Sequence, residues 1–434
     1  MKKRLIPIFL LCFLLALTAC NDNGDAETSD DPSESSVVES SVEESESAEE
    51  SDEGSSLVSS DQLPDGIVPI EDYASIYPAY VESFEQNAEM VQTTYGGSEP
   101  IDYLEVHPYL NKMYEGYVFA VQYDRARGHV YALDDVTNTE RPKLGASCLS
   151  CKVSQYEEMF AEDPGTAAKD FAEVREEITV GFTCYDCHGG TPGEMNPNRA
   201  HLANTLEKNA DQYDGHFSDE ELTCAQCHVE YYMAPETKEV VLPWDNGLTA
   251  EGAYQYYQDM DFADWEHPTT GAKLLKAQHP ETETFDGSFH DAAGLSCMSC
   301  HMPTTEVAGE EIHSHHWTSP LKTAEQSCLT CHSGDTAESI IEKAEAIQKP
   351  IVEETEVIGA ELETFINALA DAVASGDYSD EELEELREIH REAQFFFDYV
   401  FVENSEGFHN PTKANENLQH AKDLIEEGNA LLNK

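Results

Sequence analysis

The sequence predicts a mainly α-helical protein with little β-structure, in which long helices follow a loop-rich middle region. After about residue 334, helix-capping residues and apolar residues spaced three and four apart indicate long helices. Before that point, regularly paired cysteines divide the chain into short segments joined by loops. With 434 residues, 40% of them hydrophobic and 26% charged, the chain can bury a core, and it is neither wholly disordered nor a multi-span membrane protein.

Residues 1–19 have the pattern of a signal peptide. A basic start at residues 2–4 precedes an apolar run over 5–17, and small residues stand just before Cys20. The ending Leu17-Thr18-Ala19-Cys20 resembles a bacterial lipobox, which implies cleavage before Cys20 and lipid on its thiol. Ordinary cleavage near Ala19 is the alternative. We therefore expect an exported protein, lipid-anchored to the outer face of the cytoplasmic membrane.

Residues 20–63 predict a flexible acidic tether. Between Asn21 and Glu53 there are 14 Asp and Glu residues and no Lys or Arg, with almost no large apolar side chain to offset the entropy of ordering. The formal net charge of the chain is −63, so most of the negative charge lies outside the tether. We interpret this as a solvated surface suited to high salt or alkaline surroundings, and it disfavours nucleic-acid binding.

Ten of the twelve cysteines form five Cys-x-x-Cys pairs, and histidine directly follows four of these pairs. Cys-x-x-Cys-His is the attachment signature of c-type haem, because two thioethers hold the porphyrin while the adjacent imidazole reaches the iron. Disulfides and zinc are the alternatives, and four histidines at the same offset disfavour both. The pairs are Cys148/Cys151, Cys184/Cys187, Cys224/Cys227, Cys297/Cys300 and Cys328/Cys331, and the histidines are His188, His228, His301 and His332.

The first pair differs, because Lys152 stands where the proximal histidine is expected. An amine binds iron only when neutral, and taking it from a pKa of ~10.4 to the neutral form at pH 7 costs about 4 to 5 kcal/mol. A haem held by Lys152 without a distal protein ligand would be open for chemistry. The sequence therefore indicates one catalytic haem and four relay haems, with a degenerate haem site or a stray disulfide as the alternative.

From roughly Tyr114 to His409 the sequence closely resembles the ammonia-forming cytochrome c nitrite reductases, a pentahaem family. The resemblance implies five c-type haems in a catalytic region over residues 64–334, and six-electron reduction of nitrite to ammonium. It also implies reduction of hydroxylamine and nitric oxide, and a membrane-bound tetrahaem quinol dehydrogenase as electron donor. The segments that carry it are Arg127-Gly128-His129, Arg141-Pro142-Lys143, Cys148 to Lys152, Cys224 to Tyr232, and Lys276-Ala277-Gln278-His279-Pro280.

The resemblance also implies the residues around the substrate. Arg141, Tyr231 and His279 match the three that flank the bound anion, and each has a chemical reason. A fixed cation at Arg141 stabilises nitrite, His279 supplies protons near neutral pH, and Tyr231 donates or orients through its phenol. One calcium ion is implied beside the active haem, although some relatives lack it. Its ligands would be the Glu230 carboxylate, the Tyr231 and Lys276 carbonyls and the Gln278 side-chain oxygen.

Distal ligands for the four relay haems follow from the same resemblance. His129 is expected to serve the haem of Cys224/Cys227, His290 that of Cys328/Cys331, and His409 that of Cys297/Cys300. For the haem of Cys184/Cys187 the segment Ser314-His315-His316-Trp317 offers two candidates; the spacing favours His315, with His316 possible. The remaining histidines, expected to be surface or packing residues, are His107, His201, His216, His267, His313, His390 and His420.

Residues 335–434 predict long helices. Ser379-Asp380-Glu381-Glu382 is a capping box, Gly376 is a plausible end of the preceding helix, and residues 414–432 predict another helix. The resemblance implies that these helices form a homodimer interface, with packing inside one chain as the alternative. The apolar face expected in the helix after Ser379 contains Leu383, Leu386, His390, Ala393, Phe397 and Val400.

Two other classes of protein remain open from sequence. A pure electron-transfer cytochrome would need only the four histidine motifs, but it gives Lys152 no purpose. A related reductase acting on tetrathionate, sulfite or hydroxylamine would use a similar open haem.

Overall fold

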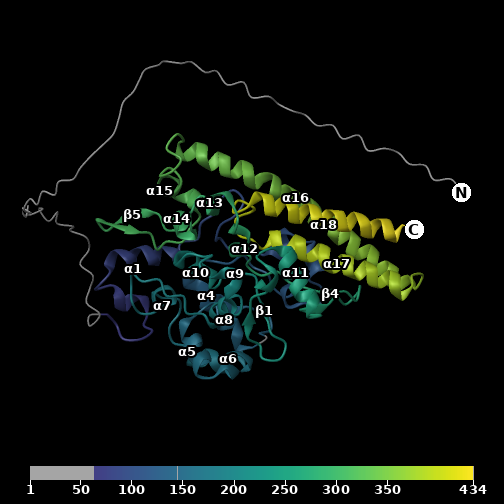
Figure 1. Ribbon diagram of the computed structural model, residues 1–434, viewed down its shortest axis with the longest axis horizontal. Coiled ribbons are helices and arrows are strands. Elements are labelled where there is room, and N and C mark those ends of the chain that lie inside the picture. Colours follow the sequence, from purple (N-terminus) through teal and green to yellow (C-terminus); the bar gives the residue numbers. More distant parts are fainter. Residues whose placement is uncertain (1–62, 144, 434) are drawn as a thin grey trace, which may run out of the picture. The chain divides into compact units, whose positions relative to one another are not determined.

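The computed structural model describes residues 63–143 and 145–433, so the expected signal peptide and nearly all of the expected tether lie outside the described residues (Figure 1). Helices dominate this part of the chain. Its strands form three short antiparallel hairpins, which confirms the prediction of a mainly α protein. None of the described helices is long and apolar enough to cross a membrane.

The middle region consists of short helices and hairpins joined by loops. Its α-helices are α1 (Pro78–Glu85), α2 (Tyr103–Val106), α3 (Leu110–Met113), α4 (Ala132–Asn138), α5 (Ser154–Glu162), α6 (Phe171–Glu177), α7 (Tyr185–His188), α8 (Ala200–Lys208), α9 (Ala210–Tyr213), α10 (Asp219–Ala225), α11 (Ala250–Asp259), α12 (Glu281–Phe285), α13 (Phe289–Ala292), α14 (Cys297–His301) and α15 (Ala324–Ser327). Its 3-10 helices are η2 (Ile70–Tyr73), η3 (Gln86–Ala88), η4 (Val118–Ala120), η5 (His129–Tyr131), η6 (Ala146–Leu149), η7 (Pro164–Ala168), η8 (Trp244–Asn246) and η9 (Pro320–Lys322). The strands are β1 (Tyr232–Met233) with β2 (Val240–Val241), β3 (Trp265–Glu266) with β4 (Lys273–Leu274), and β5 (Thr304–Val307) with β6 (Glu310–His313).

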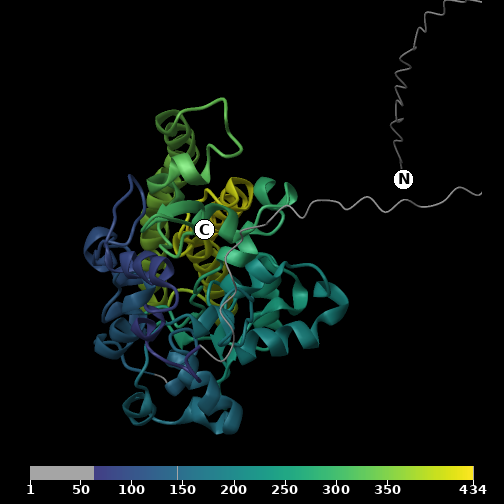
Figure 2. The ribbon, with the colours of Figure 1, turned by 90° about the vertical axis from the view of Figure 1, so that its left-hand side faces the viewer.

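Three long helices follow the middle region: α16 (Ala337–Ser375), α17 (Asp380–Phe401) and α18 (Pro411–Leu432). They contact one another in all three pairings and lie side by side in both views (Figures 1 and 2). As predicted, Ser379 forms a capping box with Glu382, and Gly376 ends α16 in the left-handed conformation, with a φ of 70°. These local signals therefore set the helix boundaries.

The largest apolar core lies between these helices and the middle region. All six residues of the face predicted in α17 are buried, and α17 contacts α11 and β4. Close approach explains Gly428 in α18, because a Cβ there would lie 2.4 Å from the Phe365 ring of α16. The long helices thus pack against the middle region through α3, α11, β4 and α15.

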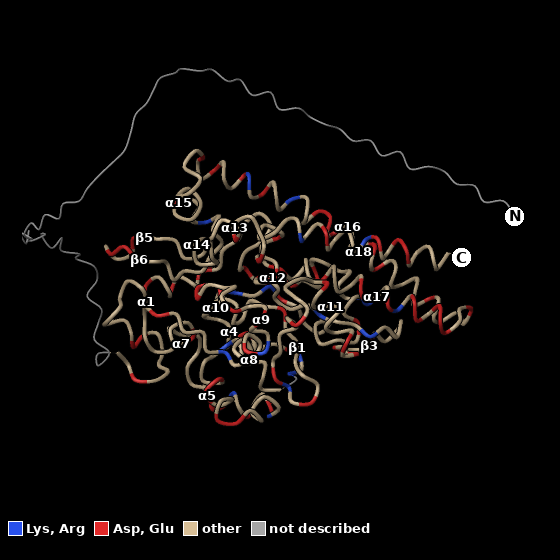
Figure 3. Tube along the Cα trace, in the orientation of Figure 1, with Lys and Arg blue, Asp and Glu red and all other residues tan. Residues whose placement is uncertain are grey.

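Acidic residues are spread over the described part of the chain and are numerous along α16 and α17, whereas basic residues are few (Figure 3). This distribution agrees with the expectation that the body itself is acidic. Two buried cations are each paired with a buried aspartate: Lys276 with Asp398 at 2.9 Å, and Arg199 with Asp186 at 2.5 Å. Such burial requires pairing, because an isolated charge in the interior is very costly.

Candidate active site and haem-binding segments

The five cysteine pairs occupy single turns of helix. In three of the histidine motifs the histidine amide donates to the carbonyl of the first cysteine, as for His188 to Cys184 at 3.0 Å, and the fourth forms α14. This turn places both sulfurs and the imidazole on one side of the segment. The first pair differs here too, since the Lys152 amide donates to Leu149 at 2.9 Å. All ten cysteines are free thiols, so no disulfide joins any of them.

The last cysteine pair departs from the other four in its setting. Nine of the ten cysteines are partly buried, but Cys331 is exposed, and so are Thr330 and His332 on either side of it. The reason is its position, because this turn connects α15 to α16 and the residues up to Gly334 are all exposed in the described structure. The turn of this last pair is nevertheless formed, because the amides of Cys331 and His332 both donate to the Cys328 carbonyl, and haem attachment there stays a prediction.

Three of the expected proximal histidines face their expected distal partners. The ring centroids are 6.0 Å apart for His129 and His228, 6.3 Å for His188 and His315, and 6.4 Å for His301 and His409. Metal–imidazole bonds of about 2 Å place two opposed ring centroids about 6 Å apart, so these pairs fit a six-coordinate haem iron. The fourth pair, His290 and His332, lies within electrostatic range.

The hydrogen bonds of these rings also fit metal binding. Nδ1 of His188 lies 2.8 Å from the Glu194 carbonyl, Nδ1 of His301 lies 3.1 Å from the Thr318 carbonyl, and Nδ1 of His315 lies 2.9 Å from the His313 carbonyl. A backbone acceptor on Nδ1 fixes the ring and leaves Nε2 available to a metal. Burial lowers the pKa of His301 and His315 to about 4, which keeps them in the neutral form that binds metals.

Most of the histidines without an expected ligand role use Nε2 in a hydrogen bond or ion pair. Nε2 of His201 lies 2.7 Å from the Gln226 carbonyl, and Nε2 of His216 lies 2.7 Å from Asp286. His267, His390 and His420 likewise have a partner on Nε2. An occupied Nε2 therefore distinguishes five of the seven remaining histidines from the expected ligands. The spacing of histidines in the sequence could not have revealed this.

Lys152 is half-buried, and its amine has no hydrogen-bond or ion-pair partner among the described residues. Tyr231 and His279 lie together near it, with ring centroids 6.5 Å apart. Burial lowers the pKa of His279 to about 4, and the nearby charge of Lys152 lowers it further, although Glu281 opposes the shift. The amine, the phenol and the imidazole therefore belong to one half-buried cluster.

Arg141 completes this cluster as a cation without a carboxylate partner in the described part of the chain. Its guanidinium lies over the Phe119 ring at 4.4 Å, and Nε donates to the Thr139 hydroxyl at 3.3 Å. Burial raises the pKa of Tyr231, and the positive charge of Arg141 opposes that rise. Arg141 thus acts on Tyr231, Tyr231 lies beside His279, and Lys152 acts on His279, so two cations flank a setting that attracts a small anion.

The residues expected to bind calcium also lie together. Glu230 accepts hydrogen bonds from the Tyr257 hydroxyl at 2.8 Å and from the Gln278 amide at 2.6 Å, and the Gln278 side chain donates to the Lys276 carbonyl at 3.1 Å. Burial raises the pKa of Glu230 well above its usual range, and no cationic side chain of the described residues pairs with it. A buried carboxylate beside backbone and amide oxygens fits a hard cation.

Sequence reasoning missed the carboxylates that contact two of the histidines expected to bind haem iron. Glu403 lies 2.6 Å from Nδ1 of His409, and Glu281 lies 3.7 Å from Nδ1 of His228. The Glu281 carboxylate raises the pKa of His228 to about 9 although burial acts in the opposite direction. The only sequence signal for Glu403 is that it stands close to His409 in a Glu-Asn-Ser turn, which is too common to be specific.

The fold and these paired histidines define a multihaem c-type cytochrome. The chain belongs to the cytochrome c552 family, whose model matches residues 69–434, and it is a cytochrome c nitrite reductase. It is 34% identical over 400 residues to a cytochrome c nitrite reductase subunit of Nitratidesulfovibrio vulgaris, covering 81% of this chain and 76% of the relative. It is 29% identical over 375 residues to cytochrome c-552 of Bacteroides fragilis, covering 82% and 75%.

Among solved structures, the chain resembles the catalytic subunit of cytochrome c nitrite reductase from Desulfovibrio desulfuricans. The TM-score is 0.79 at 30% sequence identity, with 84% of this chain and 86% of that chain covered. That subunit contains two calcium sites.

Proposed function

We propose that this nitrite reductase forms ammonium by six-electron reduction at a haem attached to Cys148 and Cys151, with Lys152 as its proximal ligand. The observation that carries the proposal is the cluster of the Lys152 amine and the Arg141 guanidinium, neither with a carboxylate partner among the described residues, beside Tyr231 and His279. An electron-transfer cytochrome has no use for such an anion-attracting cluster. The haem would supply electrons to the bound substrate at its open face.

The chain's own residues would bind the anion and deliver protons. Arg141 would hold a nitrite oxygen, because its guanidinium has no competing carboxylate among the described residues. Burial keeps His279 neutral at pH 7, so in the resting site it offers a hydrogen-bond donor; an anion bound beside it favours the protonated form and makes proton transfer easier. The same open site would accept hydroxylamine and nitric oxide.

Four further haems would relay electrons to this site, giving five in total. Their axial pairs would be His228 with His129, His188 with His315, His301 with His409, and His332 with His290. Contact between the attachment segments supports a continuous route: the Cys227 thiol lies 3.7 Å from the Cys151 carbonyl, α10 contacts α14, and α14 contacts α15. Short steps between neighbouring haems would then connect the active haem to the surface, which the route would reach at the exposed Cys331.

A calcium ion beside the active haem would take oxygens from Glu230, Tyr231, Lys276 and Gln278. The buried Glu230 carboxylate and the calcium sites of the Desulfovibrio desulfuricans subunit support this. The ion would neutralise Glu230 and fix the segment that carries His279. In this way it would act on the site without touching the substrate.

The location and partners are also proposals. The lipobox-like ending at Cys20 supports an exported, lipid-anchored protein, and such an anchor would suit a membrane-bound tetrahaem quinol dehydrogenase as donor. Ile347 and Val357 on α16 are 37% and 47% exposed, which supports a homodimer through the long helices. The domain limits proposed are 1–19, 20–63, 64–334 and 335–434.

The test is to measure haem content by mass and then follow nitrite and ammonium with a reduced dye as donor. We expect five haems, complete conversion of nitrite to ammonium, and no comparable turnover of tetrathionate. The variant Lys152→His should keep five haems but change the high-spin spectrum and lose most of the activity, whereas the exposed control Lys273→His should not. Nitrite consumed without ammonium, or an unchanged Lys152→His enzyme, would count against the proposal.

A further inference from the structure

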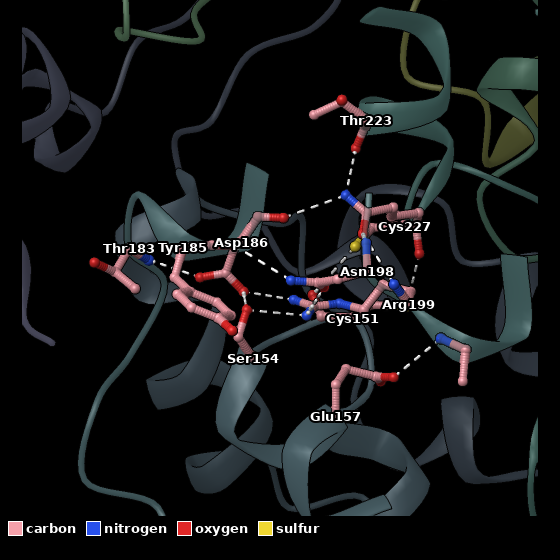
Figure 4. Close-up of polar contacts among 12 residues, drawn as sticks. Cys151, Ser154, Glu157, Thr183, Tyr185, Asp186, Asn198, Arg199, Thr223 and Cys227 are labelled. Carbon is pink, nitrogen blue, oxygen red and sulfur yellow. Dashed lines mark hydrogen bonds and ion pairs between the residues drawn. The ribbon is translucent and has the colours of Figure 1, made fainter. Parts of the chain in front are cut away.

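A deeply buried ion pair lies among the first three haem-attachment segments. Nη2 of Arg199, just before α8, is 2.5 Å from Oδ1 of Asp186, and both side chains are 1% exposed. Figure 4 shows this pair at the centre of a polar network that includes Cys151 and Cys227. Breaking a pair at such depth leaves an uncompensated charge, which makes the pair a fixed electrostatic feature of the interior.

The network joins all three segments through side chains of the cysteine motifs or next to them. Asp186 lies between Cys184 and Cys187, and Ser154 follows Lys152 by two positions. The Ser154 hydroxyl donates to Asp186 at 2.7 Å and accepts from Nη1 of Arg199 at 3.1 Å. One ion pair therefore connects the first attachment segment to the second.

Gln226, between Cys224 and Cys227, adds the third segment. Its side-chain oxygen accepts from the Arg199 amide at 3.1 Å, and its side-chain nitrogen donates to the Asp186 carbonyl at 3.2 Å. The Thr183 amide donates to the remaining carboxylate oxygen of Asp186 at 2.8 Å. Gln226 is thus hydrogen-bonded to the backbone of both members of the ion pair, which ties the third attachment segment to the other two.

The Arg199 guanidinium lies against the first and second attachment segments, since it contacts Ser154 at 3.1 Å and Asp186 at 2.5 Å, and its backbone amide contacts Gln226 of the third segment. Nε of Arg199 has no hydrogen-bond partner in the described part of the chain. A guanidinium does not lose its proton in a protein interior, and buried charges are weakly screened. The positive charge beside these segments is therefore permanent.

We propose that Arg199 and Asp186 are positioning residues that set the reduction potentials of the haems attached to Cys148/Cys151, Cys184/Cys187 and Cys224/Cys227. A buried positive charge favours the reduced haem, which carries one more electron, and a buried negative charge disfavours it. The pair keeps these two fields nearly balanced while its hydrogen bonds fix the three segments relative to one another. This inference rests on the haem attachment proposed above.

The test is a spectroelectrochemical redox titration of the haem-loaded enzyme and its variants. Asp186→Asn keeps the shape of the side chain but leaves Arg199 uncompensated, so we expect higher potentials for the first three haems than in the unmodified enzyme. Adding Arg199→Gln to Asp186→Asn removes that charge and should return the potentials close to their original values. No shift, a downward shift, or an equal shift at all five haems would overturn the inference.

Two further variants separate charge from packing. Ser154→Ala removes hydrogen bonds of the same network but no charge, and it should leave the potentials unchanged. If Asp186→Asn does not assemble, Arg199→Gln can be titrated at pH 9, where the Asp186 carboxylate stays ionised. This variant should lower the potentials of the first three haems. Arg199→Lys keeps the positive charge and should not lower them. The role of the charge would be refuted if Arg199→Gln and Arg199→Lys shifted the potentials equally. It would also be refuted if every charge variant failed to assemble with haem while Ser154→Ala assembled.

Haem content keeps the two proposals apart. A chain without haem at Cys148 and Cys151 would refute the proposed function itself. An active chain with all five haems, whose reduction potentials do not change in Asp186→Asn, would refute only the inference about the ion pair.

Discussion

The carboxylate of Glu403 lies 2.6 Å from Nδ1 of His409, and the His409 ring stands opposite His301 with 6.4 Å between centroids. Glu403 is 3% exposed, and it also accepts from the Ser405 hydroxyl at 2.6 Å, so its position is fixed. A carboxylate on the outer nitrogen makes an imidazole a stronger donor to metal. Among the proposed ligand pairs, this one has a carboxylate at hydrogen-bond distance from an imidazole, where His188, His301 and His315 have backbone carbonyls.

Replacing Glu403 by Gln should raise the potential of the haem between His301 and His409, because a weaker donor stabilises the oxidised iron less. A redox titration of the holoenzyme measures this. The matched control is Glu392→Gln, which removes the carboxylate 2.7 Å from Nε2 of His420, a histidine with no proposed ligand role. Equal shifts in both variants, or none in Glu403→Gln, would contradict the assignment of His409.

The choice between His315 and His316 can be tested directly. Since only His315 faces His188 at ligand distance, His315→Ala should open one iron coordination position and convert one low-spin haem to a high-spin form that binds carbon monoxide. His316→Ala should keep the original spectrum. The reverse result would assign the ligand to His316, and a single visible spectrum of each reduced variant is enough to decide.

These cases show which parts of the protein can be predicted from sequence. The long helices could be, because capping at Ser379 and the apolar face of α17 are local signals, and the cysteine motifs specify their own turns. The choice of His315 and the exposure of Cys331 could not be settled, since both depend on what the fold brings against a segment. Asp186 and Arg199 gave no signal at all, because each becomes informative only when the fold buries them together.

Calcium dependence provides a third prediction. Gln278→Ala removes a side-chain oxygen while keeping the backbone, so we expect weaker calcium binding and loss of activity at chelator concentrations that leave the parent enzyme active. Calcium content and activity during titration with a chelator measure the two effects. Gln255→Ala is the control, because this exposed side chain donates a hydrogen bond to Asp259 at 2.7 Å, away from the proposed calcium ligands. If neither the chelator nor the Gln278 substitution changes the activity, the enzyme has no calcium site at these residues.

The fourth prediction concerns pH and the buried carboxyl of Glu157, which accepts from the Ala200 amide at 3.1 Å and is 8% exposed. Burial raises its pKa from 4.5 to about 7, although Arg199 opposes the shift. The folded state therefore favours the protonated form. Its contribution to stability is complete below pH 4.5 and is lost as pH rises through about 7, up to about 3 kcal/mol.

Glu157→Gln cannot ionise, so it should escape this loss while its side-chain oxygen still accepts from Ala200. Relative to the parent, the variant should be more stable at pH 8 and show little difference at pH 4.5, which Tm values measured at both pH values would reveal. Glu158→Gln alters the exposed neighbour and should leave the pH dependence of Tm as it is in the parent. If Glu157→Gln and Glu158→Gln behave alike, the ionisation of Glu157 does not control stability in this range.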